Sequence, residues 1–448
     1  MSSGFRRPGN PPPIPRMSPR TFLPIVFAAL VAPAFAAPLD PLFAPEDFWE
    51  TKPDALMATA GRLGYQWTSN LRDSARVARL NMTMFGLPVA ESVVRFEGEK
   101  LKDVVFSLYA RGIEPDWPED KFRAFVARSM DAVTEVAKVK YSVRGKDPTN
   151  AVKADGVIWK NDRVQILLEY SVTKEVKARG IPFRPEFVRL EIAPPAKTTG
   201  RLGAAPVPTP GTAKFSGAAH VKRNEETGDV WLDGIPMVNQ GQNGFSILAN
   251  TERVMRYYGI GVDAHELAQA ANVSWQRSLS TAVMVETLKK LGSRMKFRVR
   301  EVEPWNSADF ARLITEYNRV AKRESSATIP DDRRGMDVTE VYRLMKPDLL
   351  KEVRTKNKSD LNRFQRQIRS GIDEGTPMLW MMILGVVPEP EPGIAGGTSG
   401  HARLIVGYNA KKEDIIYSDS WGAGHELKHM SAADAWTMTT GAMTIEPL

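Results

Sequence analysis

Alternating apolar and polar residues mark strands in the first half of the chain. Val188, Leu190 and Ile192 alternate with charged residues, and the segment 80–84 alternates in the same way. A period of two residues predicts strands that bury one face. Residues 157–172 hold two apolar runs separated by the polar sequence Lys-Asn-Asp, which predicts a hairpin.

Apolar residues spaced three and four apart predict helices in both halves of the chain. The predicted helices lie near residues 122–136, 246–258, 310–317 and 361–372. Short apolar runs that suit strands follow at 378–384, 403–406 and 414–417. The second half of the chain therefore has its helices first and its strands last.

The composition of the chain changes between residues 194 and 227. This segment is rich in Pro, Gly, Ala and Thr and has little apolar periodicity, which is typical of a linker. We therefore expect a smaller α+β domain at 37–193 and a second α+β domain at 228–448. The pattern in 37–193 predicts a fold but indicates no chemistry.

The first 36 residues have the anatomy of a secretory signal peptide. Four arginines and no acidic residue precede an apolar run from Phe22 to Ala32, and Ala34-Phe35-Ala36 offers small residues for cleavage. The apolar run is shorter than the roughly 20 residues that span a bilayer. We expect export to the periplasm or out of the cell, with no other membrane contact. An uncleaved N-terminal anchor is the alternative.

Composition narrows the possible chemistry. The 448 residues carry a formal net charge of +8, but no basic stretch is interleaved with aromatic residues, so we expect no nucleic-acid partner. The chain has no cysteine, which excludes a thiol nucleophile and a thiolate metal site. His220, His265, His425 and His429 form no recognised metal-binding motif, so we expect neither a metal nor a cofactor.

Ser246 occupies a position that suits a nucleophile, at the start of the predicted helix that ends before Gly259. The unpaired amides and the positive dipole at a helix N-terminus favour negative charge. Gln240, six residues earlier, can bring its side-chain amide to the same point. Together with the Ser246 N–H it would form an oxyanion hole. Taken alone, a serine before a helix is more often an N-cap.

A candidate base and a candidate orienting acid follow in the strand-rich part. His401 precedes one predicted strand and Asp419 follows the next. Neighbouring antiparallel strands would place Asp419 beside the His401 ring, where its carboxylate holds the tautomer and stabilises the imidazolium. The 155 residues from Ser246 to His401 are close to the roughly 130–150 that separate nucleophile and histidine in papain-like enzymes.

Three segments carry a resemblance to a known family. The runs IPMVNQGQNGFSILANTERVMRYYG, HARLIVGYN and IIYSDSWGAGHELK resemble the nucleophile, histidine and aspartate segments of papain-superfamily cysteine peptidases similar to the double-glycine leader peptidases of bacteriocin exporters. The resemblance covers about the last half of the chain and implies a papain-like fold and a peptide or protein ligand. It also implies an oxyanion role for Gln240, a base role for His401 and an orienting role for Asp419. The family's nucleophile is cysteine, and this chain has Ser246 in its place.

The exchange of cysteine for serine leaves three functions open. A serine hydroxyl is far harder to ionise than a thiol, which favours a pseudopeptidase that binds peptides without cutting them. A serine hydrolase or acyltransferase that uses Ser246, His401 and Asp419 is the second, because such triads occur on unrelated folds. The third is a structural exported protein in which the second domain serves as a scaffold.

Overall fold

A computed structural model describes most of the chain after the predicted signal peptide. The described residues are 37–43, 45–144, 150–195, 215–241, 245–273, 281–330, 337–389 and 397–448. The predicted signal segment 1–36 and residues 196–214 of the predicted linker lie outside them. Residues 36–448 form one compact unit.

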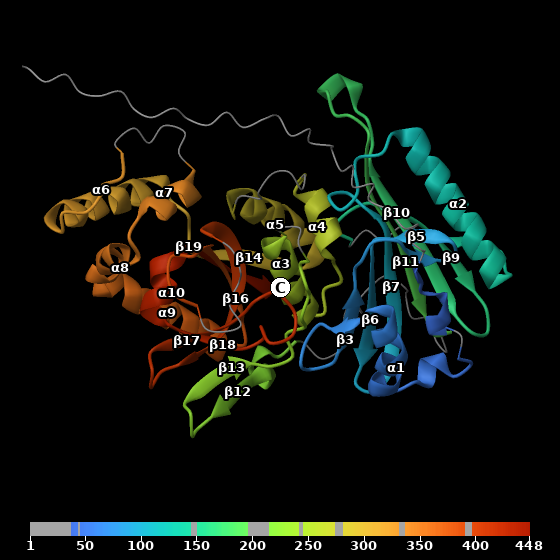
Figure 1. The fold of residues 1–448 in the computed structure, drawn as a ribbon, viewed down its shortest axis with the longest axis horizontal. Helices are drawn as coiled ribbons and strands as arrows, with labels where there is room; N and C mark the ends of the chain where they lie inside the picture. The colour runs from blue at the N-terminus through green and yellow to red at the C-terminus, as the bar shows by residue number, and fades with distance from the viewer. Residues whose placement is uncertain are drawn as a thin grey trace, which may run out of the picture. The chain divides into compact units, whose positions relative to one another are not determined.

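The N-terminal region contains two sheets and the helices α1 and α2 (Figure 1). Its elements are β1 (Ala37–Pro38), α1 (Pro53–Ala60), β2 (Gln66–Trp67), β3 (Ser74–Val77), β4 (Met82–Met84), β5 (Leu87–Val89), β6 (Glu91–Glu97), β7 (Lys100–Ala110), α2 (Glu119–Ala137), β8 (Ser142–Val143), β9 (Asp155–Lys160), β10 (Gln165–Thr173) and β11 (Arg184–Ala193). The larger sheet has the antiparallel order β2-β3-β6-β7-β11-β10-β9-β8, and the smaller has the order β1-β4-β5.

The C-terminal region places most of its helices before a mainly C-terminal antiparallel sheet. Its elements are β12 (Val221–Asn224), β13 (Asp229–Leu232), α3 (Ser246–Tyr257), α4 (Ala264–Ala270), α5 (Thr281–Met295), β14 (Phe297–Glu303), α6 (Ser307–Arg323), α7 (Val338–Leu344), α8 (Pro347–Lys356), α9 (Lys358–Asp373), β15 (Met378–Leu384), β16 (Ser399–Asn409), β17 (Asp414–Ser418), β18 (Lys428–Ser431), α10 (Ala432–Met438) and β19 (Thr439–Pro447). The sheet order is β12-β13-β16-β15-β19-β14, with β17 beside β16 and β18 beside β17. The predicted α+β class is confirmed for both regions.

The elements predicted from periodicity are confirmed, although one strand is shorter than expected. The hairpin at 157–172 is formed by β9 and β10, and the helix near 122–136 is α2. The strand expected from Leu80 begins instead at Met82. Asn81 has a φ of 63°, a left-handed conformation that interrupts a strand, and Leu80 is exposed.

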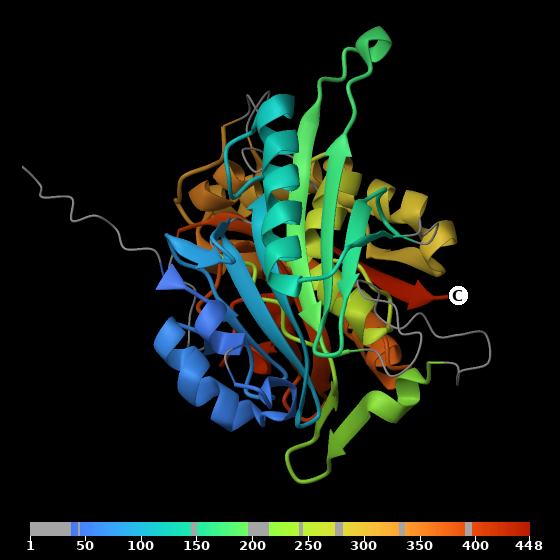
Figure 2. The same ribbon diagram turned by 90° about the vertical axis from the view of Figure 1, so that its right-hand side faces the viewer.

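The larger N-terminal sheet has one apolar face and one charged face. Leu168 of β10 lies opposite Leu190 of β11, and both belong to the apolar core that includes residues of α2. Figure 2 shows α2 running along these strands. The next pair along the strands, Glu169 opposite Arg189, points to the other face because successive side chains alternate.

The C-terminal region covers the charged face through α4 and the residue before it. Arg189 donates to Glu169 Oε2 at 2.6 Å, to Glu266 Oε1 at 2.7 Å and to the Asp263 carboxylate. We call these four residues the interface cluster. Burial, together with the negative charges of Asp263 and Glu169, outweighs the attraction of Arg189 and raises the pKa of Glu266 to about 8.

Buried apolar side chains form two clusters, one in each region. The first contains residues between Leu39 and Ile192, and the second contains mostly residues between Val230 and Ile445. Strand β15 is buried at every position, in agreement with its uninterrupted apolar sequence. Within the described residues, no helix has the length and apolar character needed to cross a membrane.

Candidate active site

Ser246 begins helix α3, and its side chain contacts the start of β16. The Ser246 Oγ is buried and accepts a hydrogen bond from the backbone N–H of Ala402 at 3.1 Å. Ala402 directly follows His401, so this bond joins the nucleophile position to the main chain beside the candidate base. Phe245, not Ser246, is at the N-cap position. Ser246 therefore does not take the capping role that a serine before a helix often has.

His401 and Asp419 lie in direct contact. His401 Nε2 is 2.9 Å from Asp419 Oδ1. Strands β16 and β17 are antiparallel, with Leu404 opposite Ser418, which places the residue after β17 near the start of β16. An ionised carboxylate only accepts hydrogen bonds, so Nε2 carries the proton and Nδ1 is the nitrogen that can act as a base. The indole N–H of Trp421 lies 3.4 Å from the same Nε2.

Three donors hold the Asp419 carboxylate. Besides His401, the Nε of Arg403 donates to Oδ2 at 2.7 Å and the backbone N–H of Ser420 donates to Oδ1 at 2.8 Å. Burial acts to raise the pKa of Asp419, but the hydrogen bond and charge of His401 and the nearby Arg403 outweigh it and lower the pKa to about 2. Asp419 is therefore ionised at neutral pH.

Arg403 places a permanent positive charge next to this pair. It lies two residues after His401 on β16, so the two side chains leave the strand on the same face. Its Nη2 donates to Glu389 Oε2 at 2.6 Å, and its guanidinium lies 4.8 Å from the centroid of the Tyr417 ring. Its Nη1 is buried and has no partner among the described residues. Because a guanidinium keeps its proton at neutral pH, Asp419 has a positive charge beside it whether His401 is protonated or not.

Gln240 is tied to the loop that carries Asp419. Its backbone N–H donates to Ser420 O at 2.9 Å, and its side-chain Oε1 accepts from the Ser420 hydroxyl at 2.6 Å. These two bonds fix the orientation of the amide. Among the described residues, the Nε2 of Gln240 has no hydrogen-bond partner, so the donor end is available, as an oxyanion donor requires.

Two buried polar residues of α3 hold the helix against the site. Asn250 Nδ2 donates to the backbone oxygens of Ser246 at 3.0 Å and Ala402 at 2.8 Å. Arg253 Nη1 donates to the backbone oxygen of Asp419 at 3.0 Å. Burial lowers the pKa of Arg253 to about 10, despite the nearby Asp419. These bonds join α3, β16 and the loop after β17 into one rigid frame.

The structure brings the four predicted site residues together, with one contact missing. His401 contacts Asp419 directly, and Gln240 joins the same loop through Ser420. Ser246 contacts the main chain beside His401, but no hydrogen bond joins its hydroxyl to the imidazole among the described residues. Within the same residues, no group of three His, Asp or Glu side chains is placed to hold a metal ion.

Sequence reasoning missed Arg403, Asn250 and Arg253. The sequence did contain a signal for two of them. Arg403 interrupts an apolar run that was predicted to be a strand, and Arg253 adjoins the apolar face of the helix that begins at Ser246. A charged residue at a position whose neighbours are buried is rarely found without a partner. The identity of that partner depends on the tertiary fold.

Comparison with known proteins agrees with the resemblance found in the sequence. Residues 232–443 match the model of the Peptidase_C39 like family. The matched range contains Gln240, Ser246, His401 and Asp419. No curated protein sequence matches the chain.

Proposed function

We propose that the Peptidase C39-like domain at residues 232–443 binds a peptide or protein ligand and hydrolyses it slowly or not at all. The family match supports a peptide ligand. Serine at the position of the family's cysteine, together with the contacts of its hydroxyl and of Asp419, supports weak hydrolysis.

The contact of the Ser246 hydroxyl is the main support for this proposal. Acyl transfer by serine needs a base that accepts the hydroxyl proton as the oxygen attacks. The Ser246 Oγ accepts a hydrogen bond from Ala402, and no described side chain accepts its proton. This contact supports a role for the hydroxyl as a hydrogen-bonding group of a binding site rather than as an activated nucleophile.

The contact of Arg403 with Asp419 also supports weak hydrolysis. The acid of a triad stabilises the positive charge that forms on the histidine. The charge of Asp419 is already shared with Arg403, whose Nε lies 2.7 Å from the carboxylate. A proton transferred to His401 would therefore receive less stabilisation from Asp419 and would also be repelled by the guanidinium.

A fluorophosphonate probe tests this proposal, because it labels only activated serines. We expect no labelling of the folded chain under conditions in which trypsin is labelled completely. Labelling at Ser246 that disappears in the His401→Ala variant would overturn the proposal.

A serine hydrolase or acyltransferase is the second candidate. It is favoured by the 2.9 Å contact between His401 and Asp419 and by the fixed amide of Gln240, since both are parts of an acyl-transfer site. This function requires the Ser246 hydroxyl to give its proton to His401, a contact that is not among the hydrogen bonds of the described residues. Labelling by the fluorophosphonate probe would establish this candidate in place of the first.

We also propose that the protein is exported and loses residues 1–36. The four arginines, the apolar run and Ala34-Phe35-Ala36 support this proposal. N-terminal sequencing of the exported protein is expected to begin near Ala37. A mature chain that begins before Phe22 would contradict it.

A further inference from the structure

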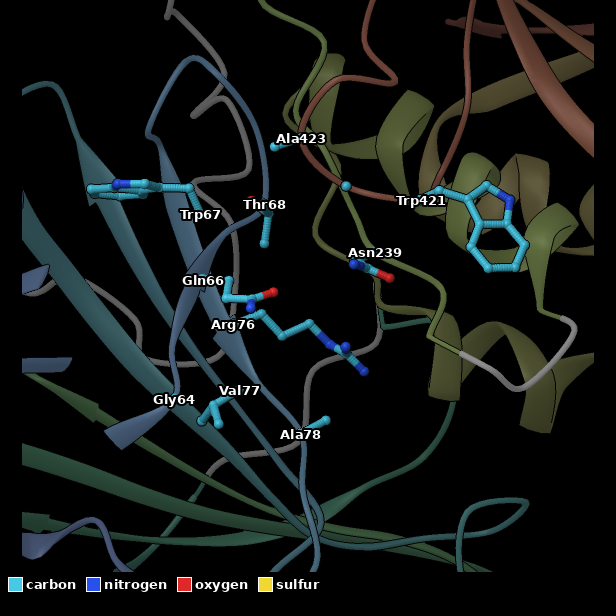
Figure 3. Close-up of a pocket in the computed structure, with 11 residues that line it drawn as sticks. Gly64, Gln66, Trp67, Thr68, Arg76, Val77, Ala78, Asn239, Trp421 and Ala423 are labelled. Atoms are coloured by element: carbon cyan, nitrogen blue, oxygen red, sulfur yellow. The ribbon is translucent and has the colours of Figure 1, made fainter. Parts of the chain in front are cut away.

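A pocket of about 350 Å³ lies between the edge of the larger N-terminal sheet and the loops that carry Gln240 and Asp419. Residues of β2, β3 and their flanks form one wall, and Asn239 with residues 421–423 forms the other (Figure 3). Strand β2 is the last strand of its sheet. The edge of the N-terminal sheet therefore lies beside the two loops that carry Gln240 and Asp419, with the pocket between them.

The second wall of the pocket adjoins the active site. Asn239 directly precedes Gln240, and Trp421 directly follows Ser420, to which Gln240 is bonded through both main chain and side chain. The Trp421 indole N–H also lies 3.4 Å from His401 Nε2. Adjacent Cα atoms are about 3.8 Å apart. A peptide held at Gln240 therefore needs only a few further residues to reach the pocket.

Hydrogen bonds hold the two walls in place. Glu426 Oε1 accepts the backbone N–H of Asn70 at 2.6 Å, and its Oε2 accepts that of Gly424 at 2.8 Å. Gly422 has a φ of 95°, and a β-carbon there would lie 3.1 Å from Asn239 Nδ2. The loop thus packs closely against Asn239. Because hydrogen bonds and close packing already connect the two walls, binding at this pocket requires little further ordering of the protein.

The pocket offers hydrogen-bond donors. Figure 3 shows the side chains of Gln66 and Arg76 extending from β2 and β3 toward the segment that carries Asn239. Arg76 lines the pocket, and its Nη2 donates to Glu91 at 2.8 Å. Asn239 Oδ1 accepts the N–H of Gly241 at 2.9 Å, which leaves its Nδ2 as a donor.

We propose that this pocket binds a segment of the peptide ligand that carries uncharged oxygen acceptors, namely backbone carbonyls and Asn or Gln side chains. This inference rests on the proposed peptide-binding function. The positive charge of Arg76 is balanced by Glu91, so a carboxylate would meet repulsion as well as attraction. The N-terminal region thereby takes part in ligand selection.

Covalent trapping of peptides in the full-length Ser246→Cys variant tests the pocket. The chain has no other cysteine, so every label reports this position. The probes are acetyl-Asn-Asn-Gly chloromethyl ketone and its Ala-Ala-Gly counterpart, whose chloride the thiolate displaces, with chloroacetone as the reagent that lacks a peptide. Iodoacetyl-Gly-Asn-Asn amide and its Ala counterpart extend from the site in the other direction. Second-order labelling rates are measured by mass spectrometry.

We expect the Asn reagent of one of these pairs to react about tenfold faster than its Ala partner, as for one or two additional hydrogen bonds. This ratio is expected to fall toward one in Arg76→Met and, independently, in Gln66→Ala, which alters an exposed side chain. Arg62→Met, at an exposed arginine of the same region outside the pocket, is the control and keeps the ratio.

The outcomes separate the two proposals. If the peptide reagents react faster than chloroacetone but the Asn and Ala forms react at equal rates, the proposed role of the pocket is wrong and peptide binding stands. The same holds if the Asn-to-Ala ratio does not change in Arg76→Met and Gln66→Ala. If the chloromethyl ketone peptides react no faster than chloroacetone, and the iodoacetyl peptides react no faster than iodoacetamide, the protein does not bind peptides at this site. Both the proposed function and the proposed role of the pocket are then wrong. A thiol that is labelled only after unfolding in urea has the same consequence, because the site is then closed to ligands.

Discussion

Two groups of buried charge in this protein differ in their balance of charge and in their connections. The interface cluster joins the N-terminal sheet to α4 and sets Arg189 against three carboxylates, of which Glu169 is also paired with Arg144. We define the active-site cluster as His401, Arg403, Asp419 and Glu389. In it, a single carboxylate, Asp419, lies between an imidazole and a guanidinium.

The balance of charge gives the two clusters opposite titration behaviour. Burial is the largest cause that raises the pKa of Glu266 to about 8, and the charges of Asp263 and Glu169 add to it against the attraction of Arg189. Burial also acts on Asp419, but its excess of donors lowers the pKa to about 2. At neutral pH, Glu266 of the interface cluster therefore holds a proton, whereas Asp419 of the active-site cluster is ionised.

The comparison shows that a shifted pKa identifies buried charge and does not by itself identify a functional site. The carboxylates of the interface cluster are engaged by Arg189, which connects two parts of the chain. The active-site cluster instead lies beside Ser246 and keeps the Nδ1 of His401 without a described partner. The active-site cluster is distinguished by this ring nitrogen, which has no described partner and belongs to the residue beside the candidate nucleophile Ser246.

Removing the cation of the interface cluster is expected to have the largest effect. Arg189→Met removes the shared partner of three carboxylates, of which only Glu169 keeps a second described ion pair, with Arg144, and should lower the free energy of unfolding by about 3–5 kcal/mol. Urea unfolding followed by circular dichroism measures the loss. Arg123→Met, which removes an exposed ion pair with Glu119, is the control and should cost less than about 0.5 kcal/mol. A loss below about 1 kcal/mol for Arg189→Met would show that the cluster stabilises little.

The pH dependence of stability tests the proton on Glu266. Its pKa is raised from 4.5 to about 8, so between these values the folded chain holds a proton that the unfolded chain has released. Stability should therefore fall as the pH rises through this window, by up to about 1.4 kcal/mol per pH unit, and level off above it. Asp419, with its lowered pKa, contributes in the opposite sense and loses its contribution as the pH falls from 3.8 to about 2.

Glu266→Gln should remove this slope, because glutamine does not titrate. The control Glu119→Gln changes an exposed carboxylate and should leave the slope as it is. The measurement is the urea midpoint at several values of pH. An unchanged slope in Glu266→Gln would show that another group holds the proton.

A thiol at position 246 tests the active-site cluster. In Ser246→Cys, the helix N-terminus and His401 should move the midpoint of iodoacetamide labelling against pH about two units below the free value near 8.5. His401→Ala in the same background should return the midpoint toward that free value. A midpoint near 8.5 that ignores the His401 change would show that these residues do not act together.

Arg403 has the smallest expected effect, and its sign is informative. In the Ser246→Cys background, Arg403→Met should lower the labelling midpoint by a further half unit or so, because Asp419 then gives its charge to His401 alone. Arg403→Lys keeps the positive charge and should change the midpoint less. A rise of the midpoint in Arg403→Met would show instead that Arg403 chiefly holds Asp419 in position.

Much of the fold followed from the pattern of apolar residues. The uninterrupted apolar run 378–384 is β15 with the predicted bounds, and the helix that begins at Ser246 is α3. Local spacing is sufficient for such elements because each buries a face whose residues are close in sequence. The order of the motifs around Ser246, His401 and Asp419 likewise indicated the family model that matches residues 232–443.

The partners of polar groups were decided by the tertiary structure. The alternation of β11 predicted that Arg189 and Leu190 lie on opposite faces, but not that α4 covers the charged face. In the same way, the sequence placed Ser246 at a helix N-terminus, while only the packing of α3 against β16 gave its hydroxyl the Ala402 N–H as donor. The spacing of apolar residues shows which side chains are buried. A tertiary hydrogen bond instead depends on two groups that come together from distant parts of the chain.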